Sequence, residues 1–290
     1  MTWFERMNSA AEYIESNLRG IIDFDVISKI MCQPAVSFQR TFSIVTGFSV
    51  FEYIRRRRMT LAAFELQNSS EKVIDIALEF GYESPEAFAR AFKETHGVSP
   101  SSARKYSLPL KAFPRITFLL SIKGDTAMDY RIEKREAFSV YGIEGIFSTE
   151  DGKNLKDIPT FWMECLNNGD YDRLIKSTNE PLSRIHAVCG YRETGGNTFP
   201  YMLFVNHDEN CDTKGFTVTE IPAATWAVFS SMEHPREKTS SVTQDLSRRV
   251  YTDWLPTAPF EKVDGYELEL YHSSGLDNSY VEIWIRVEPK

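Results

Sequence analysis

Apolar positions in the first hundred residues recur at three- and four-residue spacing, which is typical of amphipathic helices. We expect a helix over residues 5–19, a short one that Asp23 caps and that ends at Met31, and a long one over residues 50–67. After about residue 107 the pattern changes to alternating β-branched and aromatic residues with frequent Gly and Pro, which is typical of strands and turns. The chain therefore combines a helical half with a half rich in strands.

The helical half contains one short pattern twice. Phe38 and Phe42, four residues apart, give one helix its inward side, and Phe88 and Phe92 do the same for a helix that follows a turn at Gly81. A short helix, a tight turn and a second helix with an inward aromatic pair form a helix-turn-helix. The short helix before the second turn is expected to bury four apolar residues: Val73, Ile74, Ala77 and Leu78.

Specific residues sharpen this interpretation. The second unit contains Ile76-Ala77, Gly81-Tyr82-Glu83-Ser84, Phe88, Phe92-Lys93 and Gly97-Val98-Ser99-Pro100. The first contains Phe38-Gln39-Arg40, Phe42, Gly47, Tyr53-Ile54, Arg58-Met59 and Ala62. Together they resemble AraC/XylS-family transcription regulators over residues 5–106, with a departure at Cys32, where the family usually has glycine. The resemblance implies that the protein binds double-stranded DNA and works with RNA polymerase.

An α-helix fits the major groove, where every base pair presents its own pattern of donors and acceptors. The resemblance implies that the second helix of each unit reads DNA. The residues expected to face DNA are Val36, Ser37, Gln39, Arg40, Pro85, Glu86, Ala89 and Arg90. Gln39 suits adenine, and Arg40 suits guanine or a phosphate. Glu86 either accepts from cytosine or only interacts with the positive end of its helix.

The densest basic run, Arg55-Arg56-Arg57-Arg58, lies on the long helix. Four consecutive helical residues point in four directions, so they cannot all face one partner. Arg58 matches a structural arginine of the family and is expected to be an internal ion-pair partner. For the other three, phosphate contact and a solvated face stay open as alternatives.

The second half repeats the order strand, helix, strand, strand. The expected segments are about 130–147, 154–168, 184–192 and 199–206, and then 215–231, 237–254, 266–272 and 280–287. Two copies joined edge to edge make one curved antiparallel sheet, with helices on one face and an exposed concave face. We therefore predict an α+β two-domain protein: an all-α double helix-turn-helix domain over residues 1–107, a linker over 108–126, and an α+β domain of two repeats over 127–290.

The last strand carries candidate chemistry. Alternation places Tyr280, Glu282 and Trp284 on the face that helices do not cover. A carboxylate between aromatic rings suits a cationic or aromatic ligand, although Glu282 is also acceptable as an ordinary surface glutamate. The residues 221–229 and 280–285 resemble the GyrI-like effector-binding domain of Rob-type regulators, which implies a small-molecule effector. Weaker ligand candidates, each equally suited to a core, are Tyr141, Trp162, Tyr191, Tyr201, Trp226 and Tyr271.

Charge narrows the classes of function. The chain has 290 residues and a net charge of −8, yet its first 110 residues hold 13 basic and 13 acidic side chains. A neutral half with clustered arginines is compatible with DNA, whereas the acidic remainder repels it. A chromosome-associated protein with little sequence preference would need a more basic helical half.

Other features point away from metal sites, membranes and enzymes. The four cysteines are widely spaced, which argues against zinc and favours reduced thiols in a cytoplasm. No apolar run reaches the roughly 18 residues of a membrane span, and the start does not resemble a secretory signal. We expect no cofactor, no metal and no catalytic residues. The alternative function is a GyrI-like domain that hydrolyses or sequesters small molecules, fused to a DNA-binding module.

Overall fold

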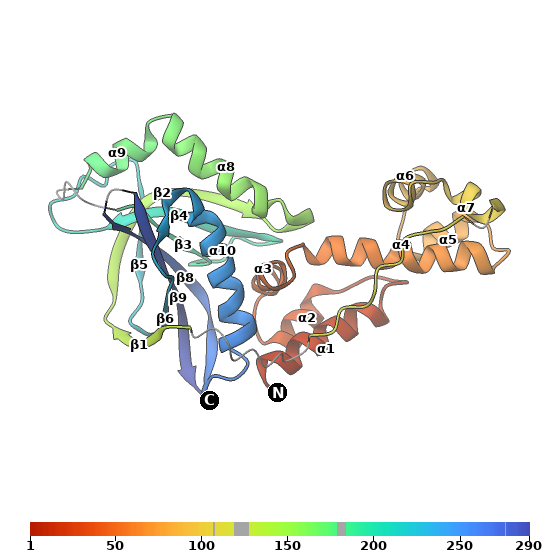
Figure 1. Ribbon diagram of the computed structural model, residues 1–290, viewed down its shortest axis with the longest axis horizontal. Coiled ribbons are helices and arrows are strands. Elements are labelled where there is room, and N and C mark those ends of the chain that lie inside the picture. Colours follow the sequence, from red (N-terminus) through yellow and green to blue (C-terminus); the bar gives the residue numbers. More distant parts are fainter. Residues whose placement is uncertain (107, 119–127, 179–183, 276) are drawn as a thin grey trace. The chain divides into compact units, whose positions relative to one another are not determined.

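The structure is a computed structural model that describes residues 1–106, 108–118, 128–178, 184–275 and 277–290 (Figure 1). The chain forms two compact units, and each is described by itself. The first unit comprises Met1–Cys32 and Phe48–Leu119. The second comprises Gln33–Gly47 and Leu120–Lys290. The division differs from the expected domain boundary in one respect, because a segment of the helical half belongs to the second unit.

The helical half folds as the double helix-turn-helix that its sequence predicts. Its helices are α1 (Trp3–Ser16), α2 (Phe24–Met31), α3 (Ala35–Thr46), α4 (Val50–Asn68), α5 (Val73–Glu79), α6 (Pro85–His96) and α7 (Pro100–Tyr106). Asp23 caps α2, and Ser84 caps α6 by accepting a hydrogen bond from the Ala87 amide at 3.1 Å. Phe88 and Phe92 are fully buried, as their spacing predicts.

One local expectation needs correction. In α5 the buried residues are Ile76 and Ala77, whereas Ile74 and Leu78 are exposed. A seven-residue helix with apolar residues on several sides has no clear stripe, so the pattern could not choose its inward face. Cys32 at the end of α2 adopts a left-handed conformation with φ 53°, the position where the family has glycine.

The arginine run pairs mostly within the first unit. Arg57 makes an ion pair with Glu15 at 2.8 Å, and Arg55 and Arg56 pair with Glu94 and Glu52. Arg58 is internal as expected, but its partners are backbone carbonyls rather than a carboxylate.

Arg58 instead holds two turns of the first unit. Its guanidinium donates to the carbonyl oxygens of Leu18 at 3.0 Å and Gly20 at 2.7 Å. It also lies so close to Gly81 that a Cβ there would be 2.9 Å from its Nη1 atom. Gly81 has φ +78°, so the backbone conformation favours glycine in the turn of the second helix-turn-helix, and a side chain there would also displace the Arg58 guanidinium.

The start of the expected linker packs on the helical unit. The Phe113 amide donates to the Thr60 hydroxyl at 3.0 Å, and the Phe118 amide donates to Asn8 at 2.9 Å. The rest of the expected linker, residues 119–126, lies outside the described residues. The prolines in 108–118 therefore belong to an extended strap with hydrogen bonds to the helices, rather than to a free spacer.

The second unit contains the predicted repeat of strand, helix, strand, strand. The first copy contains β1 (Tyr130–Arg135), β2 (Phe138–Ser148), η1 (Glu150–Gly152), α8 (Asn154–Asn167), α9 (Asp170–Lys176), β3 (His186–Cys189) and β4 (Thr198–Asn206). The second contains β5 (Thr217–Ile221), β6 (Ala224–Ser230), β7 (His234–Pro235), η2 (Arg236–Lys238), α10 (Thr239–Arg249), η3 (Val250–Trp254), β8 (Phe260–Ser274) and β9 (Asn278–Pro289).

In the described part of the unit, nine strands form one antiparallel sheet in the order β1-β6-β9-β8-β3-β4-β2-β5, with β7 on β9. The copies join through β8 and β3. The first long strand of each copy breaks into two, so β1 pairs with β6 and β5 pairs with β2 across the repeat.

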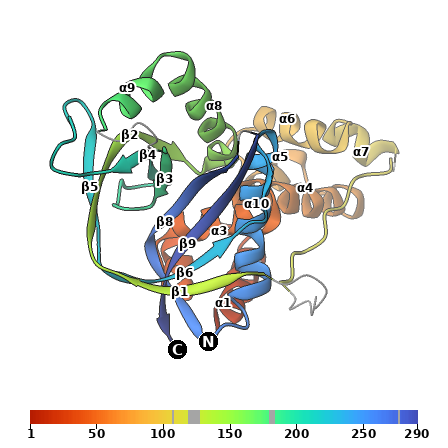
Figure 2. The ribbon, with the colours of Figure 1, turned by 60° about the vertical axis from the view of Figure 1, so that its left-hand side comes forward.

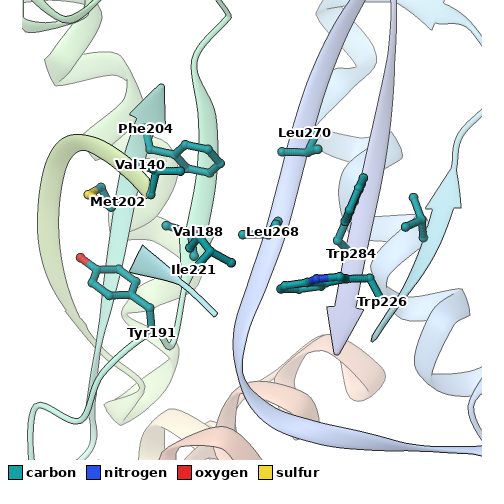
Figure 3. Close-up of a cluster of buried hydrophobic side chains, with 11 residues drawn as sticks. Val140, Val188, Tyr191, Met202, Phe204, Ile221, Trp226, Leu268, Leu270 and Trp284 are labelled. Carbon is teal, nitrogen blue, oxygen red and sulfur yellow. The ribbon is translucent and has the colours of Figure 1, made fainter. Parts of the chain in front are cut away.

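The two faces of this sheet carry different clusters. Helices α8 and α9 cover one face, where Tyr201, Leu203 and Val205 of β4 pack with Cys165 and Leu174. The opposite, concave face was expected to be open, but it is filled by apolar side chains from both copies (Figure 3). The sheet curves so strongly that Phe204 and Trp226, from different copies, belong to one buried cluster. Local alternation identifies a face but not its curvature.

Candidate DNA-reading helices and effector site

Helix α6 presents its expected reading side to solvent. Glu86 and Arg90 are exposed, and Pro85 and Ala89 are partly exposed, while Phe88 and Phe92 face the core. The cap at Ser84 and the proline at the first helical position define the start of the helix at Pro85. The side of α6 that carries Glu86 and Arg90 is therefore accessible to solvent.

Helix α3 differs, because its reading side is covered within the second unit. Figures 1 and 2 both show α3 beside α10, which it contacts. The Arg40 side chain is only 11% exposed and makes an ion pair with Glu267 of β8 at 3.0 Å. Its guanidinium lies 4.6 Å from the ring centre of Phe199 and donates to the Cys189 sulfur at 2.7 Å. Sequence reasoning placed Arg40 on an open face and did not anticipate these partners.

Gln39 is covered in the same way. It is 1% exposed, its Nε2 donates to Asn197 Oδ1 at 2.7 Å, and its Oε1 accepts from the Thr149 hydroxyl. Val36 packs beside the apolar cluster under α8 and α9, and Ser37 is partly exposed. Three of the four residues predicted to face DNA from α3 therefore contact other parts of the second unit, to which α3 itself belongs.

Glu282 lies on the concave face with Trp284, as alternation predicts, but it is only 7% exposed. Arg131 of β1 donates to its Oε1 at 2.7 Å, and Trp284 Nε1 donates to its Oε2 at 3.0 Å. His272 Nε2 lies 3.5 Å from Oε2, and the His272 ring stacks on Tyr280 with centres 4.5 Å apart. Burial raises the pKa of Glu282, but His272, Arg131 and Trp284 outweigh that effect and hold it well below its usual value.

The chain's own cations already occupy this aromatic site. The guanidinium carbons of Arg131 and Arg135 each lie 5.5 Å from the ring centre of Trp284. The negative charge of Glu282 is thus neutralised by Arg131, and the ring face that would attract a ligand cation already has two arginines near it.

The other predicted ligand residues do not gather in one place. Trp226 and Tyr191 belong to the concave-face cluster, and Trp226 packs edge-to-face on Trp284 with centres 6.0 Å apart (Figure 3). Tyr191 donates to Glu144. Tyr141 lies on the opposite, helix-covered face, where its hydroxyl is 2.9 Å from that of Ser177. One ligand cannot contact Tyr141 and Trp284 together.

A second carboxylate with different surroundings lies on the helix-covered face. Glu269 of β8 is partly buried, and its Oε2 accepts hydrogen bonds from the hydroxyls of Tyr271 at 2.7 Å and Tyr201 at 3.0 Å. Trp162 of α8 donates to the Tyr201 hydroxyl at 3.0 Å, and its ring packs edge-to-face on Tyr271. Within the described residues, Glu269 has no ion-pair partner at salt-bridge distance.

These surroundings change how easily Glu269 ionises. Burial raises its pKa, and the hydrogen bonds from Tyr271 and Tyr201 only partly oppose this. The sequence offers Trp162, Tyr201 and Tyr271 only as weaker ligand candidates, and it does not single out Glu269, the carboxylate that joins them. The available signal was alternation along β8, which puts Glu269 and Tyr271 on the face opposite Leu268 and Leu270.

Across the described ranges, no three His, Cys, Asp or Glu side chains are grouped so that they could hold a metal ion. Among the helices of the same ranges, none is both long and apolar enough to cross a membrane.

Comparisons with known proteins agree with the two-part organisation. Residues 131–287 match the family described as integron-associated effector binding protein, and residues 27–106 match a helix-turn-helix domain family. The HTH-type transcriptional activator AarP of Providencia stuartii is 41% identical over 92 residues, which is 32% of this chain and 68% of AarP. Regulatory protein SoxS of Salmonella typhimurium is 36% identical over 93 residues, 32% of this chain and 87% of SoxS. A solved integron cassette protein of Vibrio cholerae covers 55% of this chain and 95% of its own, at 20% identity and a TM-score of 0.40.

Proposed function

The chain belongs to the AraC-type helix-turn-helix regulators and, over residues 131–287, to the integron-associated effector binding proteins, and on that premise we propose that its effector is a lipophilic aromatic cation held by Glu269. It is thus a DNA-binding transcription regulator with a C-terminal effector-binding domain. The observation that carries the effector class is a carboxylate, Glu269, among aromatic side chains, with the hydroxyls of Tyr201 and Tyr271 as its hydrogen-bond donors.

A cation would supply what Glu269 lacks. A partly buried carboxylate without an ion-pair partner is costly to ionise, so a positive charge beside it gains more than it would in water. Trp162 and Tyr271 offer ring surfaces for an aromatic ligand and for cation–π contact. Both side chains are partly exposed, so the cluster lies near the surface rather than at the centre of the core.

Glu282, the anchor that the sequence suggests, stays an alternative for the same ligand class. A ligand cation there would have to compete with Arg131, which already pairs with that carboxylate. Breaking this pair costs part of the binding energy, so Glu269 is the better anchor on electrostatic grounds.

A pH titration tests the proposed anchor. Because burial raises the pKa of Glu269, its carboxyl takes up a proton at a higher pH than an ordinary glutamate does. Only the ionised form attracts a cation, so affinity for crystal violet, a triphenylmethane cation, should be constant at high pH. It should fall by up to about tenfold per pH unit once pH drops below that raised pKa. Calorimetric titration from pH 8 down to pH 4, below the usual pKa of a glutamate, measures the effect, and the Glu269→Gln variant should show no such slope.

The two outcomes separate the candidate anchors. The pKa of Glu282 lies well below its usual value, so a site that used Glu282 would keep its cation affinity throughout that range. A flat profile for the wild-type protein would therefore contradict Glu269 as the anchor.

The DNA-binding half is proposed to act as one protomer across two successive major-groove segments. Helix α4 has 19 residues and spans roughly 28 Å, which suits recognition helices about one DNA turn, near 34 Å, apart. Since AarP is a transcriptional activator, RNA polymerase is the proposed protein partner.

Arg90 provides a direct test of base reading by α6. Its exposed side chain has access to DNA, so Arg90→Ala should weaken binding to a duplex selected from random sequence by about 1–3 kcal/mol if Arg90 contacts a base. Fluorescence anisotropy on the selected duplex and on unrelated duplexes measures the effect. An equal loss on every duplex would identify a phosphate contact instead, and no loss would remove Arg90 from the interface.

A further inference from the structure

We propose that the effector-binding domain holds the first recognition helix, α3, by offering Gln39 and Arg40 substitutes for DNA, so that this helix is withheld until it is released. The inference rests on the proposed role of α3 in reading DNA. It concerns contacts that lie entirely within the second compact unit, to which Gln33–Gly47 belongs.

The partners of Gln39 reproduce the edge of an adenine. In the major groove, a glutamine amide donates to adenine N7 and accepts from adenine N6. Here Nε2 donates to Asn197 Oδ1 at 2.7 Å, while Oε1 accepts from the Thr149 hydroxyl. The amide nitrogen and oxygen that would read a base are thus both engaged, and the side chain is 1% exposed.

The partners of Arg40 reproduce an acceptor and a stacking surface. Glu267 supplies a carboxylate oxygen at 3.0 Å, where DNA would supply guanine or phosphate oxygens. The Phe199 ring lies against the guanidinium, as a base would in a stacked complex. The guanidinium cannot make this ion pair and enter a groove at the same time, so docking and DNA reading by α3 exclude each other.

Glu267 is built to keep its charge in this position. Lys262 Nζ lies 2.9 Å and the Tyr251 hydroxyl 2.9 Å from its Oε1. Burial raises the pKa of Glu267, but Lys262 and Arg40 outweigh this and lower it to about 2. The carboxylate therefore stays ionised near neutral pH, and its side chain is only 14% exposed. Because this carboxylate is ionised and shielded from water, its charge-assisted hydrogen bond to Arg40 is stronger than a bond between neutral groups.

The docked helix is next to the proposed effector site. Glu267 and Glu269 are two residues apart on β8 and share one face, so they are separated by about 7 Å along the strand. The charge of Arg40 already acts on the ionisation of Glu269. A cationic effector at Glu269 would repel Arg40 and weaken its docking, which couples effector binding to release of α3.

The test weakens the docking site without touching α3 and without adding an effector. We expect full-length Glu267→Gln and the double variant Thr149→Val/Asn197→Ala each to bind the selected duplex about tenfold more tightly than wild type, within the roughly 5–150-fold range of allosteric coupling. Glu144→Gln is the matched control, since Glu144 also pairs with an arginine and a tyrosine of this unit, Arg192 and Tyr191. It removes the same charge without contacting Gln39 or Arg40.

Accessibility of Cys189 gives a readout that needs no DNA. The Cys189 sulfur is 2.7 Å from Arg40 Nη2, and the residue is buried. Release of α3 should therefore speed the alkylation of Cys189 by a maleimide, and peptide mass spectrometry measures the rate. Buried Cys165 of α8, which packs in the apolar cluster between this helix and the sheet, is the internal reference and reports any general loss of folding in Glu267→Gln.

Each outcome decides the question. DNA affinities equal to that of Glu144→Gln, with Cys189 unchanged, would overturn the docking. Faster alkylation of Cys189 without a gain in DNA affinity would show that α3 docks but does not read DNA. In that case the proposed DNA-reading role of α3 fails, and the withheld-helix mechanism fails with it. Tighter DNA binding by both docking variants, combined with no effect of crystal violet on wild type, would support the docking and reject only the effector class.

Discussion

Replacing Phe92 with alanine is expected to lower the free energy of unfolding of the helical unit by about 3–5 kcal/mol. Phe92 is fully buried in a cluster that joins α4, α5, α6 and α7, and its ring contacts Phe88 and His96 with centres 5.7 and 4.3 Å apart. Truncation removes its apolar area and leaves a void that a small helical cluster can fill only partly. Since small domains have only about 5–15 kcal/mol of stability, DNA binding should be lost on warming.

Phe64→Ala is the matched control on the same unit. The Phe64 side chain is 57% exposed, so its loss should change stability by no more than about 0.5 kcal/mol. Urea unfolding followed by circular dichroism measures both variants, and crystal violet binding reports whether the second unit keeps its fold. If Phe92→Ala cost less than about 1 kcal/mol, the second helix-turn-helix would not depend on this aromatic core.

Phe92 also shows why the helical half could be predicted so closely from its sequence. Its partners are Phe88 and His96, each four residues away on the same helix, so the contact can be predicted from the spacing of these residues in the sequence. The caps at Asp23 and Ser84 are local for the same reason. In the short helix α5, local spacing alone does not settle the inward face, and there the prediction was wrong for Ile74 and Leu78.

The sheet half was predictable in its elements but not in its curvature. Strand ends and repeat order follow from alternation and turn residues near the chain positions concerned. The closed concave face depends on which strands become neighbours, for example β8 next to β3 and β1 next to β6. No local pattern encodes such pairings, and so the expectation of an open surface around Trp284 failed.

The contacts that cover α3 join residues that are far apart in the sequence, so they were the least predictable feature. Gln39 is 158 residues from Asn197 in the sequence, and Arg40 is 227 residues from Glu267. The sequence alone shows two polar side chains suited to base edges, and it gives no sign that a second unit carries groups of the same hydrogen-bonding pattern. The prediction that Gln39 and Arg40 read DNA bases is compatible with their observed contacts, because both depend on the same hydrogen-bond donors and acceptors of these two side chains.

Glu269→Gln is expected to weaken binding of crystal violet by about 1–3 kcal/mol, or roughly 5–150-fold, while the fold persists. The substitution keeps the shape of the side chain and one acceptor for Tyr201 and Tyr271, so what is lost is the charge. It also relieves the cost of ionising a partly buried carboxylate, since burial raises the pKa of Glu269 in the folded protein. Thermal stability near neutral pH should therefore stay equal or rise, which separates loss of ligand from loss of structure.

Glu282→Gln removes the same charge from the other face of the sheet and completes the comparison. Glu282 pairs with Arg131, so the substitution leaves that arginine near Trp284 without its full counter-charge and should reduce stability more than cation affinity. Calorimetric titration and thermal melting of both variants identify which of the two carboxylates binds the cation. Loss of crystal violet binding in Glu282→Gln, with Glu269→Gln binding as wild type does, would move the effector to the concave face. The reverse result would leave Glu269 as the carboxylate that a cationic effector meets, one strand repeat of about 7 Å from the residue that holds Arg40.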